Sequence, residues 1–523
     1  MHRFRSQASR TDWPSRSAPR RRLLQLGAGL AALAALSAGL VLLPAGEAHA
    51  QARGKDAVVI GIVLEPPALD PTAAPSAAIG EIVHYNIFEG LTRIHPDGTV
   101  SPLLAEGWSL SDDGKTYTFR LRKGVKFQDG EDCDSAAVRF SFERAKAEGS
   151  TNKAKKGVFD NIVGIATPDR HTVALTLTNP DGNFLFRMGE NTAVILHPKS
   201  AGTAATKPVG TGPYKFDSWT KGTAIQLSRW EGYRDAAAVK IGRVNFRFIN
   251  DSAAQVAALL AGDIDSFPRG LANQSLDAFK GDNRFAIEYG GTAGKGIMTI
   301  NNRKKPFDDV RVRRALSHAV DRKAFIDGVL EGLGQPIGSH FVPSDAGYVD
   351  LTGVYPHDPE KAKALLREAG VALPLNVTMT LPPPAYARKG GEVLAAQLAK
   401  VGVNVKLENV EWAQWLSGTF KGNFELTVIN HVEPLDYMRY TEPTYYWGYD
   451  SKAFRDLAAR HAASARPAER AKLFGDIQRM LAADAVNVYI FNPTQAAVSR
   501  KGLKGVWSSS PIFANDVAGM SWQ

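Results

Sequence analysis

Short apolar segments with the spacing of β-strands are the feature that most limits how this chain can fold. Residues 57–63 (AVVIGIV) predict a fully buried strand. Residues 116–122 (TYTFRLR) and 171–177 alternate apolar with polar side chains, which is typical of strands with one buried face. The chain therefore has to build sheets.

Amphipathic helices with marked ends lie between the strands. Asp358-Pro359 predicts the start of a helix that Gly370 closes. A second helix is predicted from about Arg388 to Val401, followed by a strand at 404–407. A third begins near Asp308, and its inner stripe is Val312, Ala315, Leu316, Ala319 and Val320. This succession of strands and helices predicts an α/β fold.

The length of 523 residues predicts about three domains. Hydrophobic residues make up 44% of the chain and charged residues 22%, as in an ordinary globular protein. We find no internal repeat and no low-complexity linker, so we expect a compact, multi-domain protein.

The first fifty residues predict an export signal. Seven arginines, opposed by Asp12 and Glu47, give this stretch a charge of +5, which is half of the total charge of +10. The high pI of the chain therefore does not indicate a nucleic-acid partner. Arg20-Arg21-Arg22 precedes an apolar run at 23–43, and Ala48-His49-Ala50 predicts cleavage before Gln51. The paired arginines also resemble a twin-arginine signal. The alternative is an uncleaved anchor, since the run could span a bilayer; we favour cleavage and a mature chain without a membrane span.

Catalytic motifs are missing from the sequence. There is no Gly-x-Ser-x-Gly and no His-Glu-x-x-His. Residues 290–296 (GGTAGKG) fail as a phosphate loop because Tyr289 and Gly296 replace required residues, so we interpret them as a crossing between domains. The single cysteine, Cys133, cannot form an intrachain disulfide, and no two histidines of the mature chain are spaced i, i+4. We expect no enzyme, no cofactor and no metal, although distant residues could still converge.

The order of several motifs is similar to that of bacterial extracellular solute-binding proteins of family 5, which include dipeptide, oligopeptide and nickel receptors. The matching segments are EPPALDP at 65–71, YNIFEGL at 85–91, LAEGW at 104–108, DGKTYTFRLR at 113–122, VKFQDG at 125–130, GTGPY at 210–214, FDDVRVRRALSHAVD at 307–321 and Glu411-Trp412. Most of these residues are typical of turns and strands, so we interpret them as fold determinants.

The resemblance implies a two-lobed, type II binding-protein architecture of the α/β class, with an extra subdomain in the first lobe. We expect lobe I to comprise 51–85, 207–290 and 495–523, the subdomain to cover 86–206, and lobe II to cover 291–494. Ligand would be enclosed when the lobes close about a hinge. The implied partners are a small molecule or short peptide and an inner-membrane ABC permease, and the receptor would be a periplasmic monomer.

The pocket segment departs from the dipeptide receptors of this family. Those receptors hold the amino group of the ligand with an aspartate and its carboxylate with an arginine. Aligning Glu433-Pro434 puts Asn430 at the aspartate, and counting back from Lys400 puts Leu381 at the arginine. An ordinary free dipeptide is therefore in doubt.

Other polar and aromatic residues nearby suit a pocket for an amphipathic solute. The candidate ligand contacts are Asn430, His431, Glu433, Asp436, Tyr437, Trp412, Tyr445 and Trp447, with Tyr440 close by. We expect Glu433 or Asp436 to supply the acidic anchor. The alternatives are that both carboxylates cap turns in solvent, that the aromatic side chains are core, and that His431 is an ordinary hydrogen-bonded side chain.

The function expected from the sequence is delivery of a peptide or peptide-like solute to an ABC importer. The alternatives are a non-peptide solute (an opine-like conjugate, a saccharide or a metal chelate), a periplasmic chaperone and a secreted hydrolase.

Overall fold

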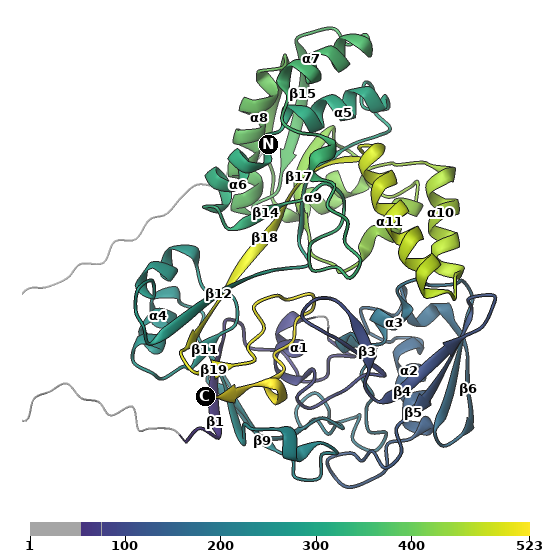
Figure 1. The fold of residues 1–523 in the computed structure, drawn as a ribbon, viewed down its shortest axis with the longest axis vertical. Helices are drawn as coiled ribbons and strands as arrows, with labels where there is room; N and C mark the ends of the chain where they lie inside the picture. Colours follow the sequence, from purple (N-terminus) through teal and green to yellow (C-terminus); the bar gives the residue numbers. More distant parts are fainter. Residues whose placement is uncertain (1–53, 75) are drawn as a thin grey trace, which may run out of the picture. The chain divides into compact units, whose positions relative to one another are not determined.

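The structure is a computed structural model that describes residues 54–74 and 76–523 (Figure 1). The chain divides into two units, residues 1–49 and 50–523, and only the second is described below. The predicted export signal and the cleavage site between Ala50 and Gln51 lie outside the described residues. Within the described part of the chain, no helix has both the length and the apolar character needed to cross a membrane.

One sheet of twelve strands dominates the fold and takes strands from both lobes. Its lobe I part contains β1 (Ala57–Ile62), β8 (Tyr214–Thr220), β9 (Ala224–Arg229), β10 (Arg243–Phe248) and β11 (Ser266–Phe267). β1 is parallel to both β10 and β11. Ile60, Phe246 and Ile225 contribute to one buried core of this lobe.

The lobe II part of the sheet is covered by helices, as Figure 1 shows. Its strands are β13 (Lys295–Ile300), β15 (Leu375–Leu381), β16 (Val403–Asn409) and β17 (Leu426–His431). The helices are α5 (Val310–Ala319), α6 (Arg322–Leu330), α7 (Pro359–Glu368) and α8 (Ala385–Ala399). Helices α10 (Lys452–Ala463) and α11 (Pro467–Ala483) pack on a separate, aromatic-rich core.

A single long strand, β18 (Asn487–Arg500), belongs to both lobes. It pairs with β13 and β14 (Gly334–Pro336) in lobe II, and with β11 and β12 (Phe285–Gly291) in lobe I. Figure 1 shows β12 and β18 side by side between the two parts of the sheet. Residues 292–294, inside the predicted crossing, connect β12 to β13.

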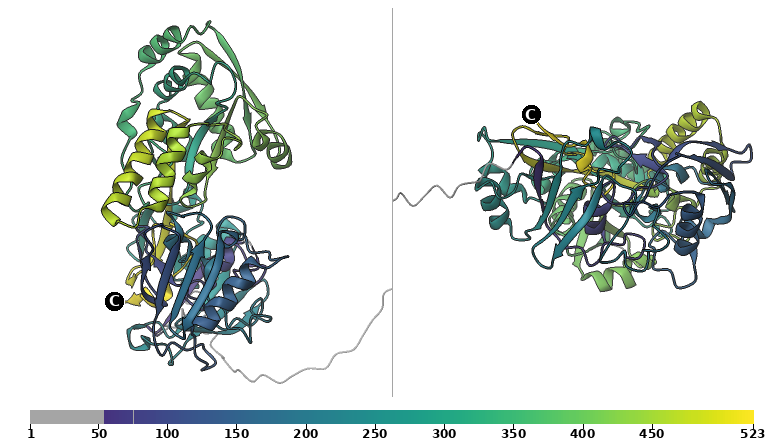
Figure 2. Two further views of the ribbon diagram at one scale, coloured as in Figure 1. Left: turned by 90° about the vertical axis from the view of Figure 1, so that its right-hand side faces the viewer. Right: turned by 90° about the horizontal axis from the view of Figure 1, so that it is seen from below.

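A second sheet of four strands carries its own core. Its order is β4 (Ala105–Leu110), β5 (Thr116–Leu121), β7 (Thr172–Leu177) and β6 (Ile162–Asp169), and helix α2 (Ser135–Lys146) packs against it (Figure 2). Tyr117, Phe119 and Leu121 are buried, as the alternation predicts. The remaining elements are α1 (Ala77–Val83), β2 (Thr92–Ile94), β3 (Val100–Pro102), α3 (Phe184–Arg187), α4 (Ser252–Leu260), α9 (Trp412–Ser417), β19 (Leu503–Lys504) and β20 (Ser521–Trp522).

The predicted helices are present, and both ends of the one predicted from Arg388 to Val401 are corrected, since α8 runs from Ala385 to Ala399. The helix begins three residues earlier than expected, directly after Pro384, which occupies the N-cap position without a side-chain cap hydrogen bond. The helix expected near Asp308 begins at Val310, where the side chain of Asp309 accepts the Arg311 N–H. All members of its predicted inner stripe are fully buried.

Candidate functional site

The carboxyl ends of three strands form one edge of the lobe II sheet. β15 is parallel to β16 and β17, so the residues that follow these strands lie at the same edge. Trp412 closely follows β16 and Val432 follows β17, and their side chains are 41% and 47% exposed. Glu433 is exposed next to Val432. Open α/β sheets bind their ligands at such carboxyl edges.

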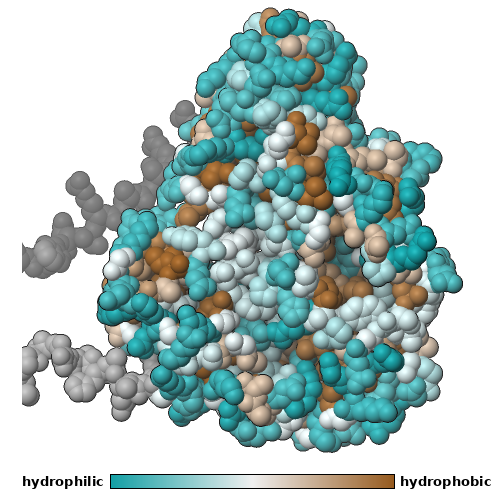
Figure 3. Space-filling model, viewed as in Figure 1, coloured by the Kyte–Doolittle hydropathy of each residue, from teal (hydrophilic) through white to brown (hydrophobic). Residues whose placement is uncertain are grey.

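Lobe I has an equivalent edge. β1, β10 and β11 are parallel, and Leu64, two residues beyond β1, is 66% exposed. Arg269 follows β11, and its guanidinium lies 3.3 Å from a Glu81 carboxylate oxygen. Figure 3 shows the viewed face hollowed at about mid-height, with hydrophobic residues beside the hollow. Apolar side chains are therefore exposed at the carboxyl edges of the parallel strands in both lobes.

A buried ion pair lies next to the lobe II edge. The ammonium of Lys295, the first residue of β13, is 2.8 Å from Asp436 Oδ1, and the two side chains are only 2% and 9% exposed. The same ammonium donates to the backbone carbonyl of Glu433 at 2.5 Å. Removing one partner of such a pair would leave an uncompensated buried charge, which costs about 3–5 kcal/mol.

Two histidines complete the hydrogen bonding of Asp436. His340 Nε2 lies 2.9 Å from Oδ1 and His431 Nδ1 lies 3.0 Å from Oδ2. An ionised carboxylate only accepts, so both ring N–H groups donate to it. The other ring nitrogens are 3.0 Å and 2.9 Å from the hydroxyls of Tyr440 and Tyr446. Each group of this network therefore has a partner.

The pKa shifts agree with an ionised Asp436 beside a neutral His340. Burial alone would raise the pKa of Asp436, but the Lys295 ammonium and the two histidines hold it well below its usual range. Burial lowers the pKa of His340 to about 4, against the opposing effect of Asp436. Burial also raises the pKa of Asp345, near Lys295, to about 6.

His340, His431 and Asp436 form a cluster of three metal-ligand side chains, with one ligand atom of each within 4.8 Å of the others. These residues are far apart in sequence, so their spacing could not reveal the convergence. Each ligand atom already takes part in the hydrogen bonds above, and Lys295 supplies the positive charge. The chemistry of this donor set therefore fits a lysine-neutralised network better than a cation site.

The predicted aromatic contacts lie mostly in the core. Tyr437 and Trp447 are fully buried, and Tyr445 is partly buried against the same cluster. The Trp447 ring stacks on Tyr440 with centroids 4.3 Å apart. Of the aromatic candidates, only Trp412 is strongly exposed at the strand edge.

The two positions aligned with the ionic anchors of dipeptide receptors differ in burial. Leu381 is buried in the lobe II core, where its side chain packs against Gly391. Asn430 lies near the end of β17, and its backbone N–H donates to Tyr386 Oη at 3.1 Å. The Asn430 side-chain oxygen has no hydrogen-bond partner among the described residues, and it lies close to Gly294 of the crossing.

Polar contacts connect the start of α3 to the segment that carries the candidate residues Glu433, Asp436 and Tyr437. The Asn183 amide donates to the Leu435 carbonyl at 3.2 Å, and the Tyr437 hydroxyl donates to Asn183 Oδ1 at 3.3 Å. Arg470 donates to the backbone carbonyl of Gly182. No local sequence signal marked Asn183, Lys295 or His340 as members of this region, because each meets its partners only through the tertiary fold.

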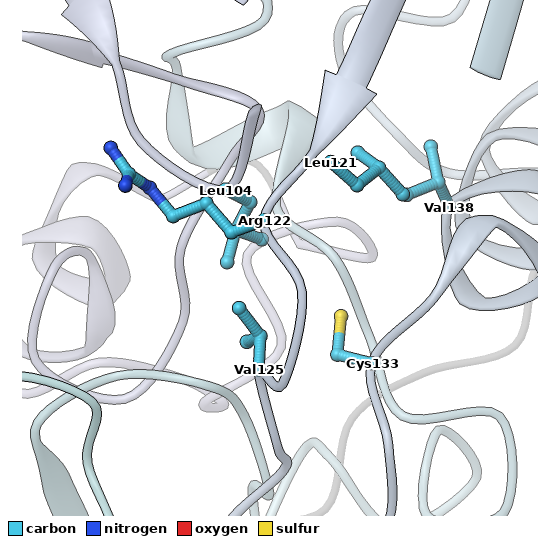
Figure 4. Close-up of a pocket in the computed structure, with 6 residues that line it drawn as sticks. All are labelled: Leu104, Leu121, Arg122, Val125, Cys133 and Val138. Carbon is cyan, nitrogen blue, oxygen red and sulfur yellow. The ribbon is translucent and has the colours of Figure 1, made fainter. Parts of the chain in front are cut away.

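A small cavity elsewhere surrounds Cys133. Leu104, Leu121, Arg122, Val125 and Val138 also line it, and Figure 4 shows the Arg122 guanidinium pointing away from the sulfur. Burial raises the pKa of the Cys133 thiol far above its usual value. A thiol in this state is a poor nucleophile, so the cavity has no chemistry of its own.

Comparison with known proteins agrees with this geometry. The profile of bacterial extracellular solute-binding proteins, family 5, matches residues 99–471, well over half of the chain. The chain belongs to this family. Among family 5 relatives, the "Di/tripeptide-binding protein 1" of Pseudomonas aeruginosa is 31% identical over 70% of this chain and 73% of its own length. The "Dipeptide-binding protein" of Escherichia coli is 30% identical over 78% and 83%. The family and these relatives are binding proteins.

Solved structures confirm the two-lobed, type II binding-protein fold. The unliganded open form of MppA, a periplasmic murein tripeptide binding protein, superposes with a TM-score of 0.80 at 22% identity, covering 90% of this chain and 98% of that one. AgaA of A. tumefaciens R10, in complex with agropinic acid, superposes with a TM-score of 0.68 at 27% identity, covering 89% and 99%.

Proposed function

We propose that this chain is an exported, monomeric, non-enzymatic receptor that delivers a peptide or peptide-like solute to an ABC importer. The observation that carries the proposal is the exposure of Leu64, Trp412 and Val432 at the carboxyl edges of parallel strands in the two lobes. Apolar walls with a few placed polar groups suit short peptides. The relatives whose names state a ligand include binding proteins for dipeptides and tripeptides, which supports this class of solute.

Within this proposal, Glu433 is the anchor for a cationic group of the solute. Its side chain is exposed beside Val432 and makes no ion pair or hydrogen bond among residues 54–74 and 76–523. Asp436, the other candidate, is buried and already pairs with Lys295.

Calorimetric titration with trialanine and N-acetyl-trialanine tests the anchor. Glu433→Gln should weaken trialanine binding at least about tenfold, or about 1.4 kcal/mol, and leave the acetylated peptide unaffected. Glu442→Gln is the matched control, because this carboxylate lies in the same segment but pairs with Arg439. Equal affinity of the wild type for both peptides would exclude Glu433 as an amine anchor.

The class of solute is tested separately by mass spectrometry of the protein purified from its native host. We expect one bound small molecule of peptide type. A conjugate of the agropinic acid type would retain the receptor role and replace the peptide. Turnover of the retained compound, or a mixture of long peptides, would contradict the receptor function.

A further inference from the structure

The turn that carries Glu433 has an unusual backbone. Leu435, two residues later, adopts a left-handed conformation with φ 50° and ψ 37°. L-amino acids other than Asn and Asp seldom adopt this conformation, which persists only where surrounding contacts enforce it. Leu435 lies between Glu433 and Asp436, so contacts made by these two residues are placed to enforce this conformation.

Lys295 holds both ends of this turn. Its ammonium donates to the Glu433 carbonyl and pairs with the Asp436 carboxylate, so a single buried cation joins residues 433 and 436. Lys295 itself is fixed at the start of β13, where it lies opposite His431 in the β17 ladder. The ammonium thereby ties the turn to the central part of the sheet.

Groups from other segments hold the Asp436 carboxylate in place. His340 reaches it from the loop after β14, and His431 from the end of β17. The Tyr440 hydroxyl, which holds His340, also accepts from Asn487 of β18 at 2.9 Å. The carboxylate therefore cannot rotate toward solvent without breaking several hydrogen bonds.

We propose that Lys295 and Asp436 are positioning residues that hold the 432–436 turn so that the Glu433 carboxylate faces the solute. This inference rests on the proposed function, since it assigns the ion pair to the anchor of that site. Neither side chain contacts the solute. Their effect on affinity passes through the backbone of the turn.

A purely structural ion pair is the competing explanation, and a double-mutant cycle separates the two. We expect Lys295→Met to weaken trialanine binding at least tenfold in the wild type. The same change should weaken binding less than threefold in a Glu433→Gln background, because the positioned group is already lost. Asp436→Asn keeps the side-chain shape and serves as a milder second variant. Equal losses in both backgrounds would overturn the inference.

Amide hydrogen exchange of the ligand-free protein gives an independent readout. Lys295→Met and Asp436→Asn should speed exchange at residues 432, 433 and 435–437 at least tenfold, while the α8 amides remain protected. Lys323→Met, which removes an exposed lysine paired with Asp327, is the control. Unchanged exchange in the turn would refute positioning even if trialanine binds. If the wild type binds no peptide while exchange responds as expected, the solute assignment fails and the ion pair controls only the turn.

Discussion

His340 Nε2 lies 2.9 Å from Asp436 Oδ1, although 96 positions separate the two residues. Burial keeps the imidazole neutral beside an ionised carboxylate whose counter-ion is Lys295. The folded state therefore requires the buried His340 ring to stay unprotonated, because burial disfavours its charged form. This requirement gives the first of five predictions.

Acidification should destabilise the protein between pH 6.5 and pH 4. Burial lowers the pKa of His340 to about 4, of His461 to about 4 and of His84 to about 3, all from 6.5. In this window the unfolded chain binds more protons than the folded one, so stability falls as pH falls. Asp345, with its pKa raised to about 6, acts in the opposite direction, and so do Asp181 and Asp516, whose pKa values burial also raises; we expect the three histidines to outweigh these carboxyls. We expect a melting temperature several degrees lower at pH 5 than at pH 7.5.

Two histidine variants test whether His340 causes this pH dependence of the melting temperature. His340→Gln should flatten the fall in melting temperature, whereas His357→Gln, at an exposed site, should leave it unchanged. A melting temperature that stays constant or rises toward pH 5 would contradict the prediction.

Leu381 should act as a core residue. Leu381→Ala should lower the free energy of unfolding by about 2–5 kcal/mol, because it leaves a cavity against Gly391 and the lobe II core. Urea denaturation measures the change. Val354→Ala, at an exposed position, should cost less than about 0.5 kcal/mol. A neutral Leu381→Ala variant with altered ligand binding would instead favour a pocket role.

Trp412 and Trp447 should respond oppositely to substitution by alanine. Trp447 is fully buried and stacked on Tyr440, so its loss should cost about 3–5 kcal/mol of stability. Trp412 is exposed at the lobe II edge, so Trp412→Ala should leave the melting temperature nearly unchanged and weaken trialanine binding. Thermal scans and calorimetry on both variants check this contrast. A Trp412→Ala variant that binds normally would remove this side chain from the site.

Binding should bring the lobes together, because a solute enclosed between two edges requires relative motion of the lobes. Small-angle X-ray scattering should give a smaller radius of gyration in the presence of saturating ligand. As a control for solute retained during purification, the protein is unfolded to release bound ligand and refolded, and ligand is then added back. An identical profile in both states would contradict a hinge receptor.

The exported protein should begin at Gln51, since Ala48-His49-Ala50 supplies the small residues a signal peptidase requires. Intact-mass measurement of periplasmic material checks the start of the chain. A mass that still includes residues 23–43 would support an uncleaved anchor.

The sequence predicted the parts of this structure that depend on local patterns. Alternation predicted the strand at 116–122, and the Asp358-Pro359 pair predicted the start of α7, because both effects act within a few residues. The acidic candidates could not be told apart in this way. Glu433 and Asp436 are three residues apart, and only the fold brings Lys295 and His340 to the carboxylate of Asp436 and not to that of Glu433. Trp412 and Trp447 likewise differ in burial and not in local pattern.

The contact of Trp522 with β1 bears on the order in which the lobes fold. The Trp522 indole N–H donates to the Ala57 carbonyl at 2.9 Å, across 465 positions, and the Asn86 amide donates to the Asn515 carbonyl at 2.7 Å. Lobe I therefore lacks these contacts until residues 515 and 522 leave the ribosome, by which point every strand of lobe II has been synthesised. Disruption of the segment around residues 515–522 would accordingly damage the lobe that contains β1, the first strand to be synthesised.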